Sequence, residues 1–276
     1  MKLTIFHLEN RGGNFIYHFI CYNLAGLYYI ENKLYDIKGP DSAKYSTFPL
    51  LNKVVSKPNE DITYPIKIHM NDIKQFHREA FEIIKDKFIL IEDLNSLHDY
   101  EVINIYGVSP NKSECNNPNI FKYIRNLFIS KITKPIKINK RIFITRKNSQ
   151  IYHNNMLKRY ILNENELMKM LIKYNFQYIQ LEELNFKDKI NLFMNSELVI
   201  SSHGSQLSFI YFCDINTKII EICNKGTIGF PNDQIYNIAS TLKINFTRYS
   251  QINEDRLGNF NLNIEEFEKF LLNIII

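Results

Sequence analysis

The second half of the chain alternates short apolar runs with amphipathic stretches of roughly ten residues, and this alternation constrains the fold more than any other feature. Short apolar runs are typical of buried strands, whereas apolar side chains at three- and four-residue spacing predict helices. Strands that alternate with such helices favour βαβ units and a parallel sheet. We expect strands at 141–145, 178–181, 197–201 and 218–222, and helices at 163–174, 185–195 and 206–212.

Two asparagines are placed to begin helices in this half. Asn163 and Asn185 each precede an amphipathic stretch, and Asn is among the preferred N-cap residues because its side-chain oxygen accepts from a free backbone N–H. Glu166 follows Asn163 by three residues, which predicts a capping box.

The first half carries the same two patterns less regularly. The segment 131–140 combines a proline with four lysines and has little periodicity, which is typical of a linker. We therefore expect an α/β protein with two domains, 1–131 and 141–276. The helix at the end of the chain packs either within the second domain or back on the first. In the first half, strands are expected at 3–7, 88–91 and 102–106, and helices at 14–29, 72–85 and 119–130.

Composition excludes several classes of protein. The net charge is +5 and no run of Lys or Arg exceeds two residues, so we expect no nucleic-acid partner. No apolar stretch reaches the roughly 18 residues of a membrane span, and the first residues resemble a strand rather than a signal peptide. The four cysteines are widely spaced, without a C-x-x-C pair. We therefore expect a reduced, cytoplasmic protein without a bound metal.

Cationic side chains follow one of the predicted strands. Arg146 and Lys147 come directly after the strand at 141–145, and Arg159 lies 12 residues beyond Lys147. Ligands of open parallel sheets bind beyond the carboxyl ends of the strands, and guanidinium groups match phosphate oxygens. These cations are therefore candidates to bind a diphosphate, with solvated surface charge as the alternative.

The segment Ser202–Ser205 joins a strand to a helix and is the second candidate. Gly204 would let a ligand approach the backbone, and the helix that follows offers free N–H groups to an anion. His203 would donate to a phosphate or a sugar hydroxyl. The alternative for Ser205 is a helix cap.

Glu221 ends the next predicted strand and would accept the hydroxyls of a ribose, unless it is an ordinary surface carboxylate. The chain contains no Asp-x-Asp motif, which commonly holds a divalent ion against the diphosphate of a sugar donor. The charge of a leaving diphosphate would therefore be met by Arg, Lys, His and helix N-termini.

In order and spacing, these pieces resemble glycosyltransferase family 61, which includes the EGF-domain O-linked N-acetylglucosamine transferase and plant xylan glycosyltransferases. The segment Asn14–Phe19 resembles, more faintly, the family's Asn…Tyr-His-His-Phe sequence. The segments that carry the main resemblance are 141–146, 159–167, 181–193, 199–205 and 219–222.

The resemblance implies a GT-B-like fold, with two Rossmann-like domains facing across a cleft. It implies an inverting hexosyl- or pentosyltransferase that needs no metal or other cofactor and moves a sugar from a UDP-sugar to a glycan or protein hydroxyl. His18 would be the general base on the acceptor side, with Asn14 beside it, and Arg146 would stabilise the leaving group. The donor would be bound by Arg146, Lys147, Arg159, Asn163, Glu164, His203, Gly204, Ser205, Gln206 and Glu221.

The sequence departs from the family pattern at two positions. Gln206 stands where the family usually has Gly, and Cys21 stands where an acid is expected. The chain is short for this fold and lacks the family's frequent membrane anchor, so it resembles a reduced cytoplasmic member from a microbe or a large virus.

Three alternatives remain open at this stage. His7, Glu9, His77 and Glu92 are other candidates for the base. A GT-B-like polysaccharide pyruvyl transferase would use phosphoenolpyruvate in place of a nucleotide sugar. A non-catalytic nucleotide- or carbohydrate-binding module would account for the departures at Cys21 and Gln206.

Overall fold

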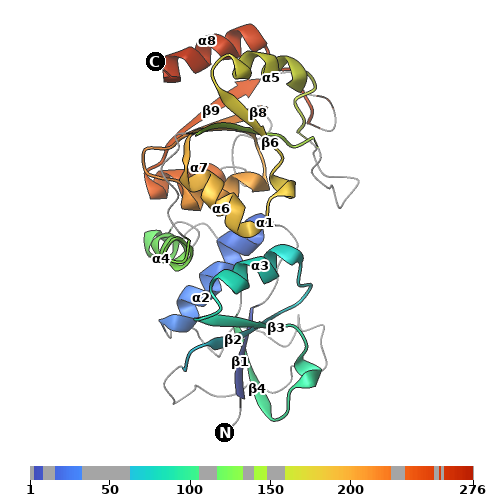
Figure 1. The fold of residues 1–276 in the computed structure, drawn as a ribbon, viewed down its shortest axis with the longest axis vertical. Coiled ribbons are helices and arrows are strands. Elements are labelled where there is room, and N and C mark those ends of the chain that lie inside the picture. Colours follow the sequence, from blue (N-terminus) through green and yellow to red (C-terminus); the bar gives the residue numbers. More distant parts are fainter. Residues whose placement is uncertain are drawn as a thin grey trace. The chain divides into compact units, whose positions relative to one another are not determined.

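The chain forms two compact units, Met1–Thr133 and Lys134–Ile276, each built around one parallel sheet (Figure 1). The predicted α/β class is confirmed in a computed structural model, and most of the expected linker lies outside the residues it describes. Among the described residues, no helix has the length and apolar character needed to cross a bilayer. The structure describes residues 3–8, 16–32, 63–105, 117–132, 140–147, 159–224, 234–251, 255 and 258–275.

The sheet of the N-terminal unit has four parallel strands in the order β3-β2-β1-β4. Strand β1 is central, and its last four residues are buried because neighbouring strands and helices cover it. This continuous burial is typical of parallel strands. The strands are β1 (Leu3–Leu8), β2 (Ile66–Met70), β3 (Phe88–Ile91) and β4 (Tyr100–Ile105).

The helices of the N-terminal unit pack side by side through aromatic contacts. The ring of Phe19 lies 6.4 Å from that of Phe81, and the ring of Tyr28 lies 5.4 Å from that of Tyr123. A π-helical segment, Phe19–Asn23, joins the first two helices into one continuous rod. The helices are α1 (Ile16–His18), α2 (Leu24–Glu31), α3 (Gln75–Ile83) and α4 (Pro118–Ile129).

The sheet of the C-terminal unit has five parallel strands in the order β6-β5-β7-β8-β9. This is the order of one common doubly wound fold. Strand β9 lies at the edge and is mostly half-exposed, whereas β5 and β7 are largely buried. The strands are β5 (Lys140–Ile144), β6 (Phe176–Ile179), β7 (Ser196–Ser202), β8 (Lys218–Asn224) and β9 (Asn245–Gln251).

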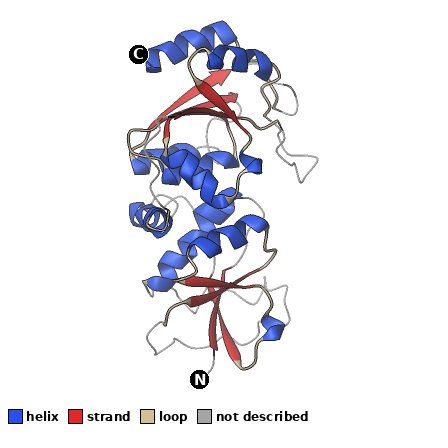
Figure 2. Cartoon of the chain, viewed as in Figure 1, coloured by secondary structure: helices blue, strands red, loops and turns tan. Residues whose placement is uncertain are grey.

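Helices cover both faces of this second sheet (Figure 2). Helices α5 and α8 lie on one face, and α6, α7 and a 3₁₀ helix, Ser205–Phe212, lie on the other. The α-helices are α5 (Glu164–Ile172), α6 (Phe186–Met194), α7 (Gln234–Leu242) and α8 (Ile264–Ile275).

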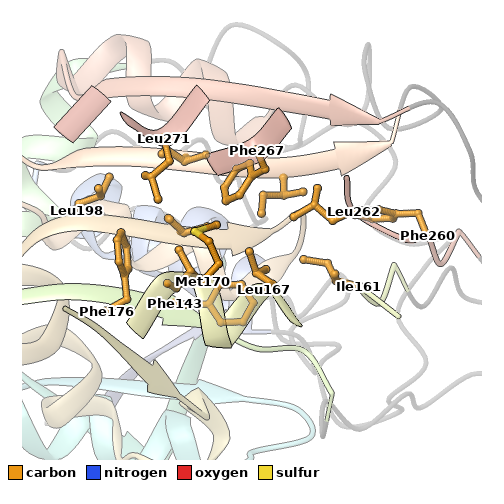
Figure 3. Close-up of a cluster of buried hydrophobic side chains, with 14 residues drawn as sticks. Phe143, Ile161, Leu167, Met170, Phe176, Leu198, Phe260, Leu262, Phe267 and Leu271 are labelled. Atoms are coloured by element: carbon orange, nitrogen blue, oxygen red, sulfur yellow. The ribbon is translucent and has the colours of Figure 1, made fainter. Parts of the chain in front are cut away.

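The core on the α5 and α8 side is built from large apolar side chains (Figure 3). Leu167 and Met170 of α5 meet Phe267 and Leu271 of α8 over the strand residue Phe143, and each is at most 2% exposed. Full burial of such side chains contributes about 1.5–3 kcal/mol each. The last helix therefore belongs to the core of the C-terminal unit.

Several expectations are confirmed and others are corrected. The strand at 141–145 corresponds to β5, and Asn185 caps α6 by accepting from the N–H of Asp188 at 2.9 Å. The capping box at Asn163 was wrong, because this side chain instead exchanges hydrogen bonds with the backbone of Leu262 at 2.8 and 2.9 Å. The helix expected at 206–212 is a 3₁₀ helix. The sequence reasoning had not placed β2, α7 or β9.

Candidate functional site

The strand order of the C-terminal sheet marks the carboxyl ends of β5 and β7 as a candidate ligand site. Strand β6 follows β5 on one side, whereas β7 and then β8 continue on the other side. Ligands of open α/β sheets bind beyond the carboxyl ends of the strands at such a reversal of strand order. Arg146 follows β5 and His203 follows β7, so two predicted site residues meet there.

Arg146 reaches across this position and contacts the backbone of the neighbouring strand end. Its Nη1 donates to the carbonyl oxygen of His203 at 2.6 Å and lies 3.4 Å from Oε1 of Gln206. A Cβ atom at Gly204 would lie 1.6 Å from this Nη1 and 2.8 Å from Cζ. Gly204 was expected to admit a ligand, and in this structure it admits the guanidinium of Arg146.

The described residues compensate the charge of Arg146 poorly. Burial and the positive charge of Arg159 together lower the pKa of Arg146 to about 10, against the opposing influence of Tyr160 and Glu182. Within the described residues, Arg146 pairs with no carboxylate, and its buried Nε makes no hydrogen bond. A desolvated cation beside a second cation favours a bound anion.

The backbone around Arg159 is held in an uncommon conformation. Arg159 has φ +56°, in the left-handed region that residues other than glycine seldom adopt. The next residue is fixed by two hydrogen bonds, from Tyr160 N to Oδ1 of Asn259 and from Phe260 N to the Tyr160 carbonyl, each 3.0 Å. Such strain often accompanies functional sites, and the charge of Arg159 acts on the nearby Arg146.

Glu164 opens α5 and is buried at 7% exposure. Its carboxylate accepts from the hydroxyl of Thr145 at 2.8 and 2.9 Å and from the hydroxyl of Tyr178 at 3.0 Å. Burial and this carboxylate raise the pKa of Tyr178. Thr145 also accepts from the backbone N–H of Lys147 at 3.0 Å. The network therefore fixes the turn that carries the exposed Lys147 and the half-buried Arg146.

A small pocket of about 140 Å³ opens beside this network. It is smaller than the roughly 300–1,000 Å³ of typical small-molecule sites, so it suits one part of a larger ligand. Lys147 and Glu164, two residues predicted to bind the donor, line it together with Tyr160. The remaining lining residues are Ile161, Leu162 and Asn165.

His203 and Glu221 form a buried pair on neighbouring strands. Nδ1 of His203 lies 2.6 Å from Oε1 of Glu221, and Nε of Arg248 on β9 donates to Oε2 at 2.5 Å. Glu221 is 0% exposed. Both of its oxygens are thus engaged by protein groups in this structure, and its expected contact with a ribose stays a prediction.

Gln206 links the 3₁₀ helix to β7. Its side-chain amide donates to Oγ of Ser201 at 3.0 Å and to the carbonyl of Ser202 at 2.8 Å, while its oxygen faces Arg146. The alternative of a helix cap at Ser205 does not hold, because the N-cap position is occupied by Gly204, which has no side chain to cap the helix. Ser205 is exposed.

The residues expected on the acceptor side belong to the N-terminal unit. His18 is half-buried at the end of α1, with its ring 5.6 Å from that of Tyr17. Cys21 is buried in the π-helical segment. Asn14 lies outside the described residues, so its expected role stays a prediction.

The other candidates for the base occupy different environments. His77 is fully buried and accepts from the N–H of Lys74 at 2.8 Å. Glu92 pairs with Arg78 at 2.7 Å on the surface, and Glu9 lies outside the described residues.

His7 forms a pair that sequence reasoning missed. His7 on β1 is directly opposite His69 on β2, and their Nδ1 atoms share a hydrogen bond of 2.7 Å. Burial, with the adjacent His69, lowers the pKa of His7 to about 4, and burial also lowers the pKa of His69. Both rings are therefore neutral at pH 7. The sequence pattern does not predict strand β2, so it could not place His69 opposite His7.

Three residues of the C-terminal site were also missed. Thr145 and Tyr178 hold Glu164, and Arg248 holds Glu221. Thr145 could have been found from its place directly before Arg146. Arg248 could not, because it lies on the edge strand β9, which the sequence pattern does not predict. In the described ranges, no group of three or more His, Cys, Asp or Glu side chains is arranged to hold a metal ion.

Comparison with protein-family models identifies a family that matches most of the chain. No curated protein matches the chain. The family model described as Glycosyltransferase 61 matches residues 16–220. The match takes in more than half of the chain and parts of both compact units. This protein therefore belongs to glycosyltransferase family 61.

Proposed function

We propose that this protein transfers a sugar from a UDP-sugar to a hydroxyl of a glycan or protein acceptor. The observation that carries the proposal is Arg146, a desolvated guanidinium without a carboxylate partner among the described residues, beside Arg159 at the strand-order reversal. Family membership supplies the reaction class, which needs a donor and an acceptor. The Arg pair supports a donor with a diphosphate.

The proposed reaction inverts the anomeric carbon in a single displacement. The acceptor oxygen forms a bond to C1 of the sugar while the bond from C1 to the diphosphate oxygen breaks. The diphosphate leaves with the electron pair of that bond, and the acceptor proton passes to a base. Arg146 and Arg159 stabilise the charge that develops on the diphosphate. The free N–H groups at the start of the 3₁₀ helix add to this stabilisation.

We assign the base to His18, because an imidazole is the side chain that most often serves as a general base. The N-terminal unit would then bind the acceptor and the C-terminal unit the donor, in a GT-B-like arrangement. The proposal includes no metal ion and no other cofactor. What supports this is that two guanidinium groups already supply positive charge where the diphosphate would lie.

A thermal-shift comparison on the full chain tests the nucleotide part of the proposal. Saturating UDP should raise the melting temperature, because a ligand that binds only the folded state stabilises it. Phosphoenolpyruvate should leave the melting temperature unchanged. A shift with phosphoenolpyruvate and none with UDP would favour pyruvyl transfer instead.

Turnover separates an enzyme from a binding module. A panel of UDP-sugars should reveal at least one that releases UDP in the presence of the protein and a chelator, with loss of release in Arg146→Gln. Binding of UDP without turnover of any UDP-sugar, alone or with glycan acceptors, would favour the non-catalytic module. Retention of the anomeric configuration in the product would contradict the inverting step.

A further inference from the structure

The carboxylate of Glu221 lies between two nitrogen donors in a buried position. Glu221 on β8 and Arg248 on β9 are directly opposite in the sheet register, and His203 follows β7 on the other side of β8. Arg248 donates to Oε2, and Nδ1 of His203 contacts Oε1. Because Glu221 is 0% exposed, these two contacts replace the water that would otherwise solvate its charge.

The position of the proton on His203 follows from this arrangement. An ionised carboxylate only accepts hydrogen bonds, so Nδ1 of His203 must carry the hydrogen. Arg248 already supplies a positive charge beside Glu221. A neutral imidazole with hydrogen on Nδ1 has a lone pair on Nε2. Among the described residues, the imidazole of His203 is engaged through Nδ1, by Glu221.

Arg248 is itself held in place by aromatic side chains. Its guanidinium carbon lies 5.8 Å from the ring centre of Tyr236 and 5.9 Å from that of Phe246. Such contacts attract a cation to the face of a ring. Arg248 lies beyond residues 16–220, the range that the family model matches.

We propose that Arg248 is a positioning residue, which through Glu221 holds His203 as the Nδ1–H tautomer so that Nε2 accepts a hydrogen bond from a hydroxyl of the bound nucleotide sugar. This inference rests on the proposed function. Arg146 and His203 then have separate tasks. The guanidinium of Arg146 binds phosphate oxygens, whereas the lone pair on Nε2 of His203 would repel them. Nε2 of His203 accepts a hydrogen bond from a hydroxyl, which belongs either to the ribose or to the transferred sugar.

Nitrogen-15 NMR of the imidazole rings in the full-length protein tests the tautomer directly. We expect wild-type His203 to be protonated on Nδ1 and bare on Nε2 at pH 7.5. In Arg248→Met, the carboxylate of Glu221 loses one of its two partners, so the Nδ1–H signal of His203 should shift or broaden, and Arg248→Lys, which keeps a donor at this position, should restore part of the wild-type signal. A wild-type ring that carries hydrogen on Nε2 would overturn the inference without any variant.

Binding measurements identify the hydroxyl. His203→Phe keeps a ring of similar shape without the acceptor, and the loss of one hydrogen bond should weaken binding by about three- to tenfold. If the ribose supplies the hydroxyl, this loss is seen with UDP but not with 2′-deoxy-UDP. If the sugar supplies it, UDP binds equally to both proteins and UDP-N-acetylglucosamine binds less well to His203→Phe.

The outcomes separate the two proposals. Equal affinities of wild type and His203→Phe for UDP and UDP-N-acetylglucosamine would overturn the hydroxyl contact while leaving the proposed function intact. Failure of the wild type to bind any of these nucleotides would instead overturn the proposed function together with the hydroxyl contact.

Discussion

The two units differ in the charge of the side chains at the carboxyl ends of their parallel strands. At the carboxyl edge of the N-terminal sheet, His7 and His69 share a hydrogen bond and remain neutral because burial lowers the pKa of each. At the carboxyl edge of the C-terminal sheet, Arg146 and Arg159 concentrate positive charge. The difference shows that a parallel sheet supplies only the location of a site, whereas the residues after its strands decide what binds there.

The comparison also separates charge that is balanced from charge that is not. In the C-terminal unit, Arg248 is paired with Glu221, and Arg141 is paired with Glu197 at 3.2 Å. Arg146 lies in the same unit without a carboxylate partner among the described residues. A ligand anion would therefore gain most at Arg146, and Arg141 offers a matched control at the opposite end of β5.

The largest expected effect concerns the acid sensitivity of the N-terminal unit. The pKa of His7 is about 4 in the fold against 6.5 in the unfolded chain. As the pH falls below 6.5, the unfolded chain binds this proton first, so stability that is present above pH 6.5 is lost between pH 6.5 and 4. The shift corresponds to about 3 kcal/mol. Hydrogen exchange of the β1 and β2 amides, corrected for intrinsic rates, measures this loss.

The control for this prediction is His7→Gln, which removes the titrating ring. Its β1 and β2 amides should lose much less protection on acidification than those of the wild type, while the amides of β5 and β7 should respond alike in both proteins. An identical pH dependence of β1 in the two proteins would contradict the neutral state of the histidine pair.

A smaller effect is expected from Gly204→Ala in the C-terminal unit. The new Cβ would occupy the space of the Arg146 guanidinium, which must then leave the His203 carbonyl. We expect UDP affinity to fall by about tenfold, because a charge-assisted contact is worth about 1.5–3 kcal/mol. Isothermal titration calorimetry measures the loss.

The double variant Gly204→Ala with Arg146→Gln tests the cause. If the alanine acts only by moving Arg146, the double variant binds UDP as Arg146→Gln alone does, because mutations that act through one contact are not additive. Fully additive losses would show that Gly204 contacts the nucleotide independently of Arg146.

The smallest effect is expected at the exposed cation of the same turn. Lys147→Ala should weaken UDP binding by only about two- to fivefold, since exposed charge pairs contribute up to about 1 kcal/mol. Titrations at low and high salt should show the effect disappear as screening increases. Lys173→Ala, an exposed lysine paired with Glu268 on the same unit, is the control and should bind as the wild type does at both salt concentrations.

The sequence predicted the fold where burial produces a clear apolar pattern. β5, β7 and β8 are apolar runs, and each was expected near its observed bounds. β9 was missed because an edge strand is half-exposed, so its residues lack an apolar run. The capping box at Asn163 failed because Leu262, distant in sequence, competes for the same side chain.

The candidate site was predictable as a set of residues but not as a set of contacts. Arg146, His203 and Glu221 follow strands of one sheet, which the strand pattern indicates. That Gly204 accommodates Arg146, and that Arg248 contacts Glu221, depends on pairs separated by 58 and 27 residues. No local pattern encodes such pairs, so they emerge only from the packed structure.

The most direct test of the central claim is the affinity of UDP for Arg146→Gln, measured by calorimetry beside the wild type and Arg141→Gln. The account predicts a loss of about 10- to 100-fold for Arg146→Gln and unchanged affinity for Arg141→Gln, whose charge is already paired. Wild-type affinity in a folded Arg146→Gln protein would contradict the claim that Arg146 binds the diphosphate.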